Sequence, residues 1–402
     1  MQKKSPIAGN ACYVSSSTGE TFEADTALWC ASDGAYLGLS AGQGLRRSDI
    51  VHDENSLWRY GAAIRVDAER RISLGEGWTP LVPRNWNGAK VAFKLEYLAP
   101  TGSFKDRGMT VMMTYLRTVG VKAVLEDSSG NAGASMAAYA AAAGISCRVL
   151  VPATASRGKI VQIEAMGADV VLVPGTRQDV ADRALEEAKN VFYASHNWQP
   201  FFLEGTKTLA FEIWEQNGFE SPDAVVVPLG YGSNVLGLWI GFNELRLAGE
   251  IECLPRLYAV QAANCAAFGA AWREGVDHEV SFTPQPTIAD GIASLHPVRM
   301  KEVLTAVSQS GGAVVTVSED EIEAGLTGLL SHGLFVEPTS ATAGAALTKL
   351  RAEGMLKEDE KTVVVLTGSG LKAPERIGEV IGKFRGKTGA THRRPTQTRT
   401  MP

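Results

Sequence analysis

A lysine among turn residues is the first candidate for chemistry. Lys105 lies in residues 100–108, PTGSFKDRG, where we expect a strand to lead into a helix that runs through Tyr115. The dipole at a helix N-terminus favours negative charge, so a purely structural lysine gains little there. A lysine that forms an imine does gain, because a lowered pKa leaves more of the neutral, nucleophilic amine. Taken alone, a solvated lysine followed by an Asp-Arg pair remains the alternative.

Three glycine-bearing loops are candidate anion sites. Residues 128–133 read SSGNAG, residues 230–234 read GYGSN, and residues 366–372 read LTGSGLK. Each follows an apolar run, and backbone N–H groups at a helix start bind carboxylate or phosphate. Any one of them could be a simple turn. Ligands collect outside the carboxyl ends of strands in open α/β sheets, so the three together favour a shared ligand site.

The elements that position these loops alternate along the chain. Short β-branched runs separated by longer helical stretches predict an α/β protein with mostly parallel sheets. The predicted strands are residues 91–94, 123–127, 147–151, 170–173, 224–228, 257–261, 314–317 and 363–367. Residues 1–72 have weaker periodicity and are interpreted as an N-terminal extension. Residues 386–402 have little to bury, so we expect a disordered tail.

Composition excludes several classes of function. The 402 residues include 39 Lys plus Arg and 44 Asp plus Glu, a formal net charge of −5, which argues against nucleic-acid binding. No apolar run approaches the roughly 20 residues of a membrane span, and the first residues do not resemble a signal peptide. Five irregularly spaced cysteines are not typical of a disulfide framework. We therefore expect a soluble, cytoplasmic protein with no membrane partner.

Eight motifs occur in order on the expected elements. Besides the lysine segment and the three loops, they are SLWRY at 56–60, LGEGWTPL at 74–81, LEGTKT at 203–208 and EPTSA at 337–341. Over about residues 55–376 the chain resembles the threonine synthase branch of the fold type II, tryptophan synthase β-like, pyridoxal-phosphate enzymes. The resemblance implies two open, twisted, mostly parallel α/β domains with pyridoxal 5'-phosphate between them, in a homodimer. The large domain would comprise 73–120 and 201–385, and the small, mobile domain 121–200.

The resemblance also implies roles for individual residues. Lys105 would be the catalytic residue, holding the cofactor as an internal aldimine and carrying protons, with Phe104 near the ring. Asn131 would bond the ring hydroxyl, and Thr367 would face the pyridine nitrogen, which suits elimination and replacement over transamination. The cofactor phosphate would be bound by Gly230, Tyr231, Gly232, Ser233 and Asn234. The substrate carboxylate would be bound by Ser128, Ser129, Gly130, Asn131 and Ala132.

The reaction implied is that of a carbon–oxygen lyase converting a small amino acid, O-phosphohomoserine, into threonine and phosphate. One departure concerns the substrate phosphate, because Phe202 stands where the family commonly has an arginine. A phenyl ring cannot pair with phosphate, and Lys207, or Arg157 with Lys159, are possible substitutes.

The N-terminal extension departs from the family as well. The spacings Cys12-x2-Ser15 and Cys30-x2-Asp33 stand where related proteins carry paired cysteines, so we expect a degenerate zinc ribbon without metal.

Other functions compete with this one. Phe202 favours a β-eliminase or β-replacement enzyme acting on serine, threonine, diaminopropionate or phosphoserine. A cofactor-binding scaffold or regulator is a non-enzymatic alternative, although it would need neither Lys105 nor Asn131. A nicotinamide-dependent dehydrogenase fits less well, because the glycine spacing at 230–237 is not the dinucleotide fingerprint. His196 is interpreted as a structural hydrogen-bonding residue, since a lone histidine is more often that than a catalyst.

Overall fold

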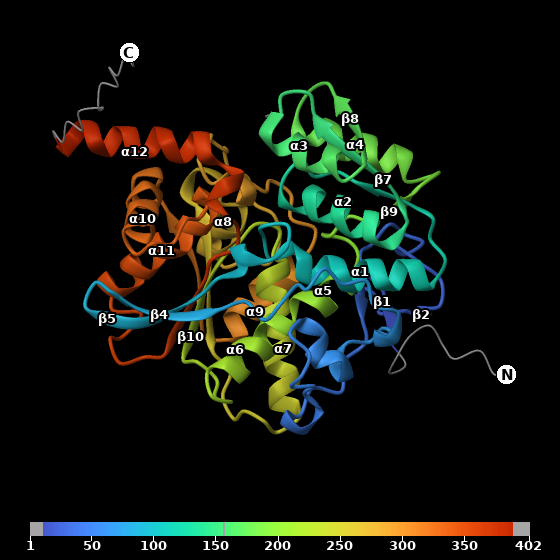
Figure 1. The fold of residues 1–402 in the computed structure, drawn as a ribbon, viewed down its shortest axis with the longest axis horizontal. Helices are drawn as coiled ribbons and strands as arrows, with labels where there is room; N and C mark the ends of the chain where they lie inside the picture. The colour runs from blue at the N-terminus through green and yellow to red at the C-terminus, as the bar shows by residue number, and fades with distance from the viewer. Residues whose placement is uncertain (1–10, 156, 389–402) are drawn as a thin grey trace, which may run out of the picture.

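The computed structural model describes residues 11–155 and 157–388. Its largest element is a six-stranded sheet in the order β12-β11-β10-β13-β5-β4 (Figure 1). Neighbouring strands are parallel except β4, which pairs antiparallel with β5 at one edge. The strand bounds are β4 Leu81–Trp86, β5 Ala89–Lys94, β10 Ala224–Pro228, β11 Arg256–Ala262, β12 Ala313–Val317 and β13 Thr362–Val365.

Helices cover both faces of this sheet. Val225 and Val227 of β10 face one apolar core, whereas Val226 faces the other, because successive side chains of a strand point to opposite faces. The first core is closed by α6 Thr208–Gln216, α7 Ser233–Leu247, α8 Ala267–Glu274 and α9 Met300–Gln309. The second is closed by α10 Glu319–Ser331, α11 Pro338–Ala352 and α12 Pro374–Thr388.

A separate four-stranded parallel sheet has the order β8-β7-β6-β9. Its strands are β6 Ala123–Glu126, β7 Ser146–Pro152, β8 Asp169–Val173 and β9 Phe192–Tyr193. The helices beside it are α2 Asn131–Ala143, α3 Arg157–Ala165 and α4 Arg177–Glu187. In Figure 1 this unit lies at the upper right, apart from the larger sheet.

Helices α1 (Lys105–Thr118) and α5 (Phe201–Thr206) connect the two sheets and pack on each other. The N-terminal extension covers them with an antiparallel sheet of β1 Cys12–Ser15, β2 Thr21–Glu23 and β3 Leu37–Leu39. Tyr13 of β1 shares a hydrogen bond of 2.6 Å between its hydroxyl and that of Tyr115. The Tyr115 ring stacks on Phe201 at 3.8 Å between centroids. The extension is therefore part of the core around α1.

Short 3-10 helices connect several elements. They are η1 Arg47–Asp49, η2 Leu57–Ala63, η3 Ala68–Arg70, η4 Glu96–Leu98, η5 Ala263–Cys265, η6 Asp290–Ile292 and η7 Gly370–Lys372.

The predicted α/β class with mostly parallel sheets is confirmed. Every strand predicted from the sequence has a counterpart within about two residues at each end. The sequence interpretation missed β1 to β4 and the two-residue β9. The domain limits remain a prediction. Of the tail predicted to be disordered, 386–388 belong to α12 and the rest lies outside the described residues.

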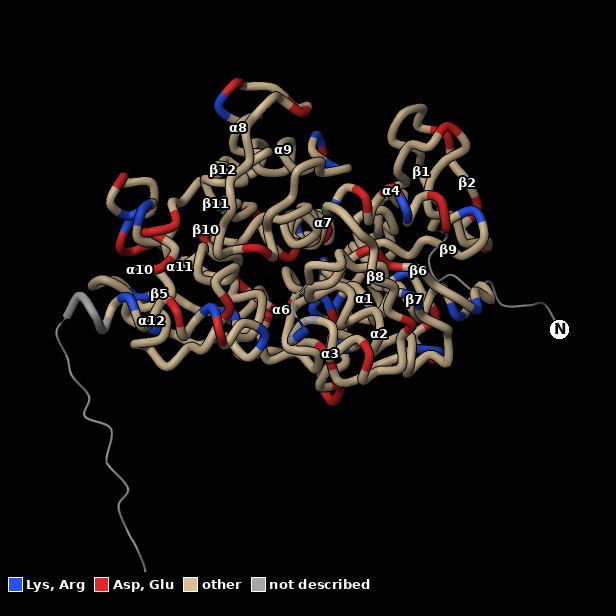
Figure 2. Tube along the Cα trace, turned by 90° about the horizontal axis from the view of Figure 1, so that it is seen from above, with Lys and Arg blue, Asp and Glu red and all other residues tan. Residues whose placement is uncertain are grey.

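The charged residues are mixed over the molecule. Figure 2 shows Lys and Arg interspersed with Asp and Glu along the whole trace, in keeping with the small net charge. Within residues 11–155 and 157–388, no helix is both long enough and apolar enough to cross a membrane. In that same part of the chain, no group of three or more His, Cys, Asp or Glu side chains is placed to hold a metal ion.

Candidate active site

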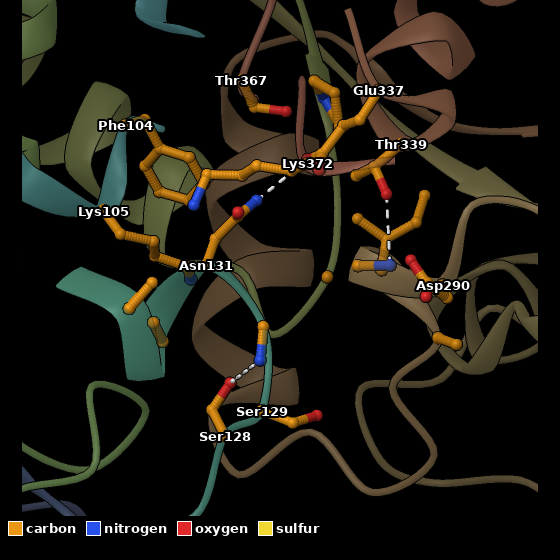
Figure 3. A pocket seen from close by; sticks show the side chains of 18 of the residues that line it. Phe104, Lys105, Ser128, Ser129, Asn131, Asp290, Glu337, Thr339, Thr367 and Lys372 are labelled. Carbon is orange, nitrogen blue, oxygen red and sulfur yellow. Dashed lines mark hydrogen bonds between the residues drawn. The ribbon is translucent and has the colours of Figure 1, made fainter. Parts of the chain in front are cut away.

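A cavity of about 590 Å³ lies between the two parallel sheets, beyond the carboxyl ends of β6, β9, β10 and β13. All the cofactor- and substrate-binding residues predicted from the sequence line it (Figure 3). They come from the start of α1, the β6–α2 loop, the β10–α7 loop and the segment after β13. Loops more than 200 positions apart therefore meet at one site.

Lys105 begins α1 and reaches into this cavity. Its ammonium lies 4.6 Å from the centre of the Phe104 ring and 5.6 Å from that of Phe202. Within the described residues it forms no hydrogen bond or ion pair. Burial lowers the pKa of Lys105 to about 8, although the carboxyl groups of Glu126 and Glu337 oppose that shift. A substantial share of this amine is thus neutral near physiological pH, as a nucleophile or a base requires.

The turn before Lys105 is fixed by the next residue, Asp106. Its carboxylate accepts hydrogen bonds from the Thr101 amide at 2.7 Å and from the Thr101 and Ser135 hydroxyls at 2.6 Å each. Burial raises the pKa of Asp106 to about 6, with these hydrogen bonds acting in the opposite sense. Because Ser135 belongs to α2, Asp106 ties the loop that carries Lys105 to the helix that carries Asn131.

Asn131 is the first residue of α2 and lies across the cavity from Glu337. The Asn131 amide Nδ2 donates to Glu337 Oε1 at 2.9 Å, which fixes the orientation of the amide. The loop before it can turn tightly only because Gly133 has no side chain. A Cβ there would lie 1.9 Å from the carbonyl oxygen of Ser128. The glycine at position 133 is thus required by the backbone of the loop.

The β10–α7 loop presents the N-terminus of a 15-residue helix to the cavity. Gly232 has φ +99°, and a Cβ there would lie 2.3 Å from Val303. The side chain of Asn234 is buried, yet neither its oxygen nor its nitrogen has a hydrogen-bond partner in the part of the chain that the structure describes. Free backbone donors, a favourable dipole and an unsatisfied amide are what a phosphate group needs.

Thr367 lies directly after β13, and its hydroxyl is 3.0 Å from that of Ser340 at the start of α11. The Ser340 hydroxyl also accepts a hydrogen bond from the Gly368 amide at 2.8 Å. Both threonine and serine are buried. The Thr367 hydroxyl is therefore held in place. A pyridine nitrogen facing it would meet a neutral group.

Four charged residues of the cavity had no role assigned from the sequence, namely Arg177, Asp290, Glu337 and Lys372, whereas His196 was interpreted as a structural hydrogen-bonding residue. Glu337 and Lys372 lie in motifs that were recognised, whereas no sequence signal marked Arg177, at the start of α4, or Asp290, at the start of η6. His196 Nδ1 lies 3.3 Å from Glu126 Oε1. Burial lowers the pKa of His196 well below its usual value, and the positive charges of Lys105 and Arg177 add to this. His196 is thus neutral at physiological pH.

Phe202 is fully buried, and its ring lies 5.5 Å from that of His196. Of the cations suggested as substitutes for an arginine there, Lys207 forms ion pairs with two glutamates outside the cavity. Its ammonium is buried between Glu204, at 3.1 Å, and Glu244, at 2.9 Å, and it does not line the cavity. Arg157 pairs with Glu164 on the surface, and the side chain of Lys159 lies outside the described residues. Lys207, one of the possible substitutes, is therefore not placed to bind a substrate phosphate in the cavity.

Comparison with known proteins decides the family. A family model described as pyridoxal-phosphate dependent enzyme matches residues 72–368. The chain belongs to the pyridoxal-phosphate-dependent enzymes. Its relatives include threonine synthase from Methanocaldococcus jannaschii, which is 36% identical over 371 residues, 89% of this chain and 92% of that protein. Threonine synthase from Mycobacterium tuberculosis is 37% identical over 312 residues, 76% of this chain and 84% of that protein.

A solved structure supports the fold of this pyridoxal-phosphate enzyme. Threonine deaminase isoform 2 from Solanum lycopersicum superimposes with a TM-score of 0.65 at 24% identity, over 76% of this chain and 83% of that chain. The predicted cofactor, lyase class and threonine synthase-like branch are confirmed. These comparisons give no support to the two alternatives of a nicotinamide-dependent dehydrogenase and a non-enzymatic scaffold.

Proposed function

We propose that the protein converts O-phosphohomoserine and water into threonine and inorganic phosphate, using pyridoxal phosphate. The observation that carries this proposal is the Lys105 amine, which forms no ion pair with any described residue and lies in a cavity where glycine-bearing loops from both sheets meet. Relatives named threonine synthase that share more than a third of their residues with most of this chain support it.

The residues of the cavity fit the cofactor. Lys105 would bind its aldehyde carbon, beside Phe104, and Asn131 would donate to or accept from its ring hydroxyl. The phosphate would be held by the loop from Gly230 to Ser233 and by the unsatisfied amide of Asn234. Thr367 would meet the ring nitrogen.

The bound cofactor would supply an electron-withdrawing ring that stabilises negative charge on the substrate carbon next to the amino group. The protein's share is proton transfer, and Lys105 is placed for it. With its pKa lowered to about 8, the Nζ of Lys105 can accept a proton from substrate Cα and return one later.

The β6–α2 loop would orient the substrate. Backbone N–H groups of Ser128 to Ala132 at the N-terminus of α2 offer donors to the substrate carboxylate. Holding the carboxylate there would direct the rest of the amino acid toward Lys105 and fix the Cα proton for removal.

Phe202 favours a second candidate, a β-eliminase or β-replacement enzyme acting on serine, threonine, diaminopropionate or phosphoserine. The ring is fully buried beside the cavity, and a Cβ on Gly108 would lie only 2.5 Å from it. An apolar ring 5.6 Å from the Lys105 ammonium offers no partner to a substrate phosphate, which favours an amino acid with a short side chain.

Product analysis of the purified holoenzyme separates the two. We expect O-phosphohomoserine to give threonine and phosphate in equal amounts. Serine or diaminopropionate turned over to a keto acid and ammonia, with no phosphate released from O-phosphohomoserine, would instead establish the eliminase.

We further propose that the enzyme works in the cytoplasm as a homodimer. The five cysteines are all free thiols in the described residues, which suits a reducing compartment. The dimer rests on the resemblance to the family alone. Sedimentation of the holoenzyme gives the test, and a monomer at assay concentrations would refute the dimer.

A further inference from the structure

Arg177 is the one arginine that lines the cavity within the described part of the chain. It is the first residue of α4 and belongs to the unit built on the four-stranded sheet. Its Nη2 donates to Asp127 Oδ2 at 2.7 Å. Its Nη1 is out of contact with solvent and has no hydrogen-bond partner among the described residues. One side of the guanidinium is therefore anchored while another donor is unused.

The anchor keeps the guanidinium charged and oriented. Burial tends to lower the pKa of Arg177, but the Asp127 carboxylate, together with Tyr231 and Tyr193, outweighs this effect, and the pKa is raised. A buried donor without a partner is unfavourable, and an incoming anion would satisfy it with a charge-assisted bond. Arginine also presents its donors in a planar fork, which matches phosphate or carboxylate geometry.

The positive charges of Arg177 and Lys105 affect the pKa of the same two residues, His196 and Glu126. Both positive charges lower the pKa of His196, after the larger effect of its burial. Both also stabilise the charged form of Glu126, whose pKa is nevertheless raised by burial and by Asp127. Arg177 and Lys105 therefore both lie within electrostatic reach of His196, which lines the cavity, and of its buried partner Glu126.

The other cations of the cavity are less suited to a side-chain anion. Lys105 is the proposed cofactor-bearing residue. The ammonium of Lys372 donates to Gln162 Oε1 at 2.9 Å, and burial lowers its pKa. The carboxyl groups of Asp290 and Glu337 also line the cavity, so an anion is favoured only where an oriented cation receives it.

We propose that Arg177 binds the anionic group at the far end of the amino-acid substrate and so determines the enzyme's preference for phosphorylated side chains. This inference rests on the proposed function. It assigns to α4 a contact with the phosphate that Phe202, on α5, cannot make. Substrate binding would then join the unit carrying α4 to the loops of the larger sheet.

The test compares Arg177→Gln and Arg177→Lys with a matched control, Arg183→Gln. Arg183 is exposed on the same helix, where it pairs with Glu187, and does not line the cavity. The visible absorption of each holoenzyme is titrated with O-phosphohomoserine, with O-phosphoserine and with serine. Inorganic phosphate is added separately as a competitor. Cofactor loading and thermal unfolding report whether each variant is intact.

We expect Arg177→Gln to weaken binding of both phosphorylated amino acids, and competition by phosphate, by about 10- to 100-fold. Serine binding should be unchanged, and Arg177→Lys, which keeps the charge without the fork, should fall between. Equal loss for serine and the phosphorylated compounds would overturn the inference, because it indicates a structural role. Unchanged binding in both variants, or no binding of phosphorylated compounds by the wild type, would overturn it as well.

Phosphate release by the wild type distinguishes this inference from the proposed reaction. Binding that depends on Arg177 without any phosphate release would support the inference and refute the reaction. Phosphate release that is unaffected in both Arg177 variants would keep the reaction and refute the inference. If Arg177→Gln does not fold because Asp127 is left unpaired, Arg177→Lys and the phosphate competition still decide the matter.

Discussion

Asn131 and Glu337, 206 positions apart in the chain, meet across the cavity through a hydrogen bond of 2.9 Å from the asparagine amide to the glutamate carboxylate. The same carboxylate raises the pKa of Lys105 against the larger, opposite effect of burial. Glu337 therefore orients Asn131 and also favours the protonated form of Lys105, and both of these residues are proposed to bind the cofactor.

Removing the charge of Glu337 should make Lys105 more acidic. In Glu337→Gln the amide oxygen can still accept from Asn131, but the carboxylate no longer stabilises the lysine ammonium. Because the neutral amine is the form that reacts, the rate at which apoprotein regains its visible band with added pyridoxal phosphate should rise with pH. The midpoint should lie at about pH 8 in the wild type and at lower pH in the variant. Glu379→Gln, which removes a surface ion pair with Arg376, is the control, and a midpoint moved upward would contradict the assignment.

Gly133→Ala should damage the β6–α2 loop. A Cβ at this position would lie 1.9 Å from the Ser128 carbonyl oxygen, so the loop must shift. We expect a loss of about 1–3 kcal/mol in the free energy of unfolding, from overpacking, together with weaker binding of amino-acid substrates. Gly378→Ala is the matched control in α12, where a Cβ meets open space and should stabilise the helix by up to about 1 kcal/mol. Equal stability of the two variants in urea would show that the loop is not constrained as described.

The buried ion pairs around Glu212 should make the protein sensitive to acid. Burial tends to raise the pKa of Glu212, but Arg107, at 2.7 Å, and Lys94 outweigh it and hold the pKa at about 2. Because this value is below the 4.5 of an unperturbed glutamate, the stabilisation is complete above pH 4.5 and is lost as the pH falls toward 2. Urea unfolding at a series of pH values measures this slope, and stability that does not change below pH 4.5 would contradict it.

Glu212→Gln tests the same ion pairs at neutral pH. Removing one partner leaves buried charges uncompensated, so we expect a loss of about 3–5 kcal/mol. The surface pair of Arg183 with Glu186 provides the comparison, and Glu186→Gln should change stability by about 1 kcal/mol or less. Similar effects for the two substitutions would mean that the buried pairs contribute little.

The fold could be predicted where the sequence carries a local pattern. The buried parallel strands, such as β10 with its run AVVVP, and the glycine loops that follow them were visible in the sequence. β4 was missed because Pro83, Arg84 and Asn85 give it neither apolar character nor strict alternation, as an exposed edge strand allows. β9 has only two residues, too few for a periodicity to be recognised.

The residues of the site could also be predicted only where they stand in a local sequence pattern. Lys105, Asn131 and Thr367 stand in loops with strong turn chemistry, so their gathering at strand ends followed from the α/β class. Arg177 lies in an ordinary helix start whose capping box says nothing about a cavity. Lys207 looked available in the sequence, but its pairing with Glu244 of α7 depends on tertiary packing. Such contacts between distant elements leave no local signature.

The most direct test of the account is to locate the cofactor on the chain. Borohydride reduction of the holoenzyme fixes pyridoxal phosphate to the amine that carries it, and peptide mass spectrometry then identifies the residue. Two lysines line the cavity within the described residues, Lys105 and Lys372. We expect the modification on Lys105 and its absence in Lys105→Ala. A modified Lys372 in the wild type, or no stable modification at all, would contradict it.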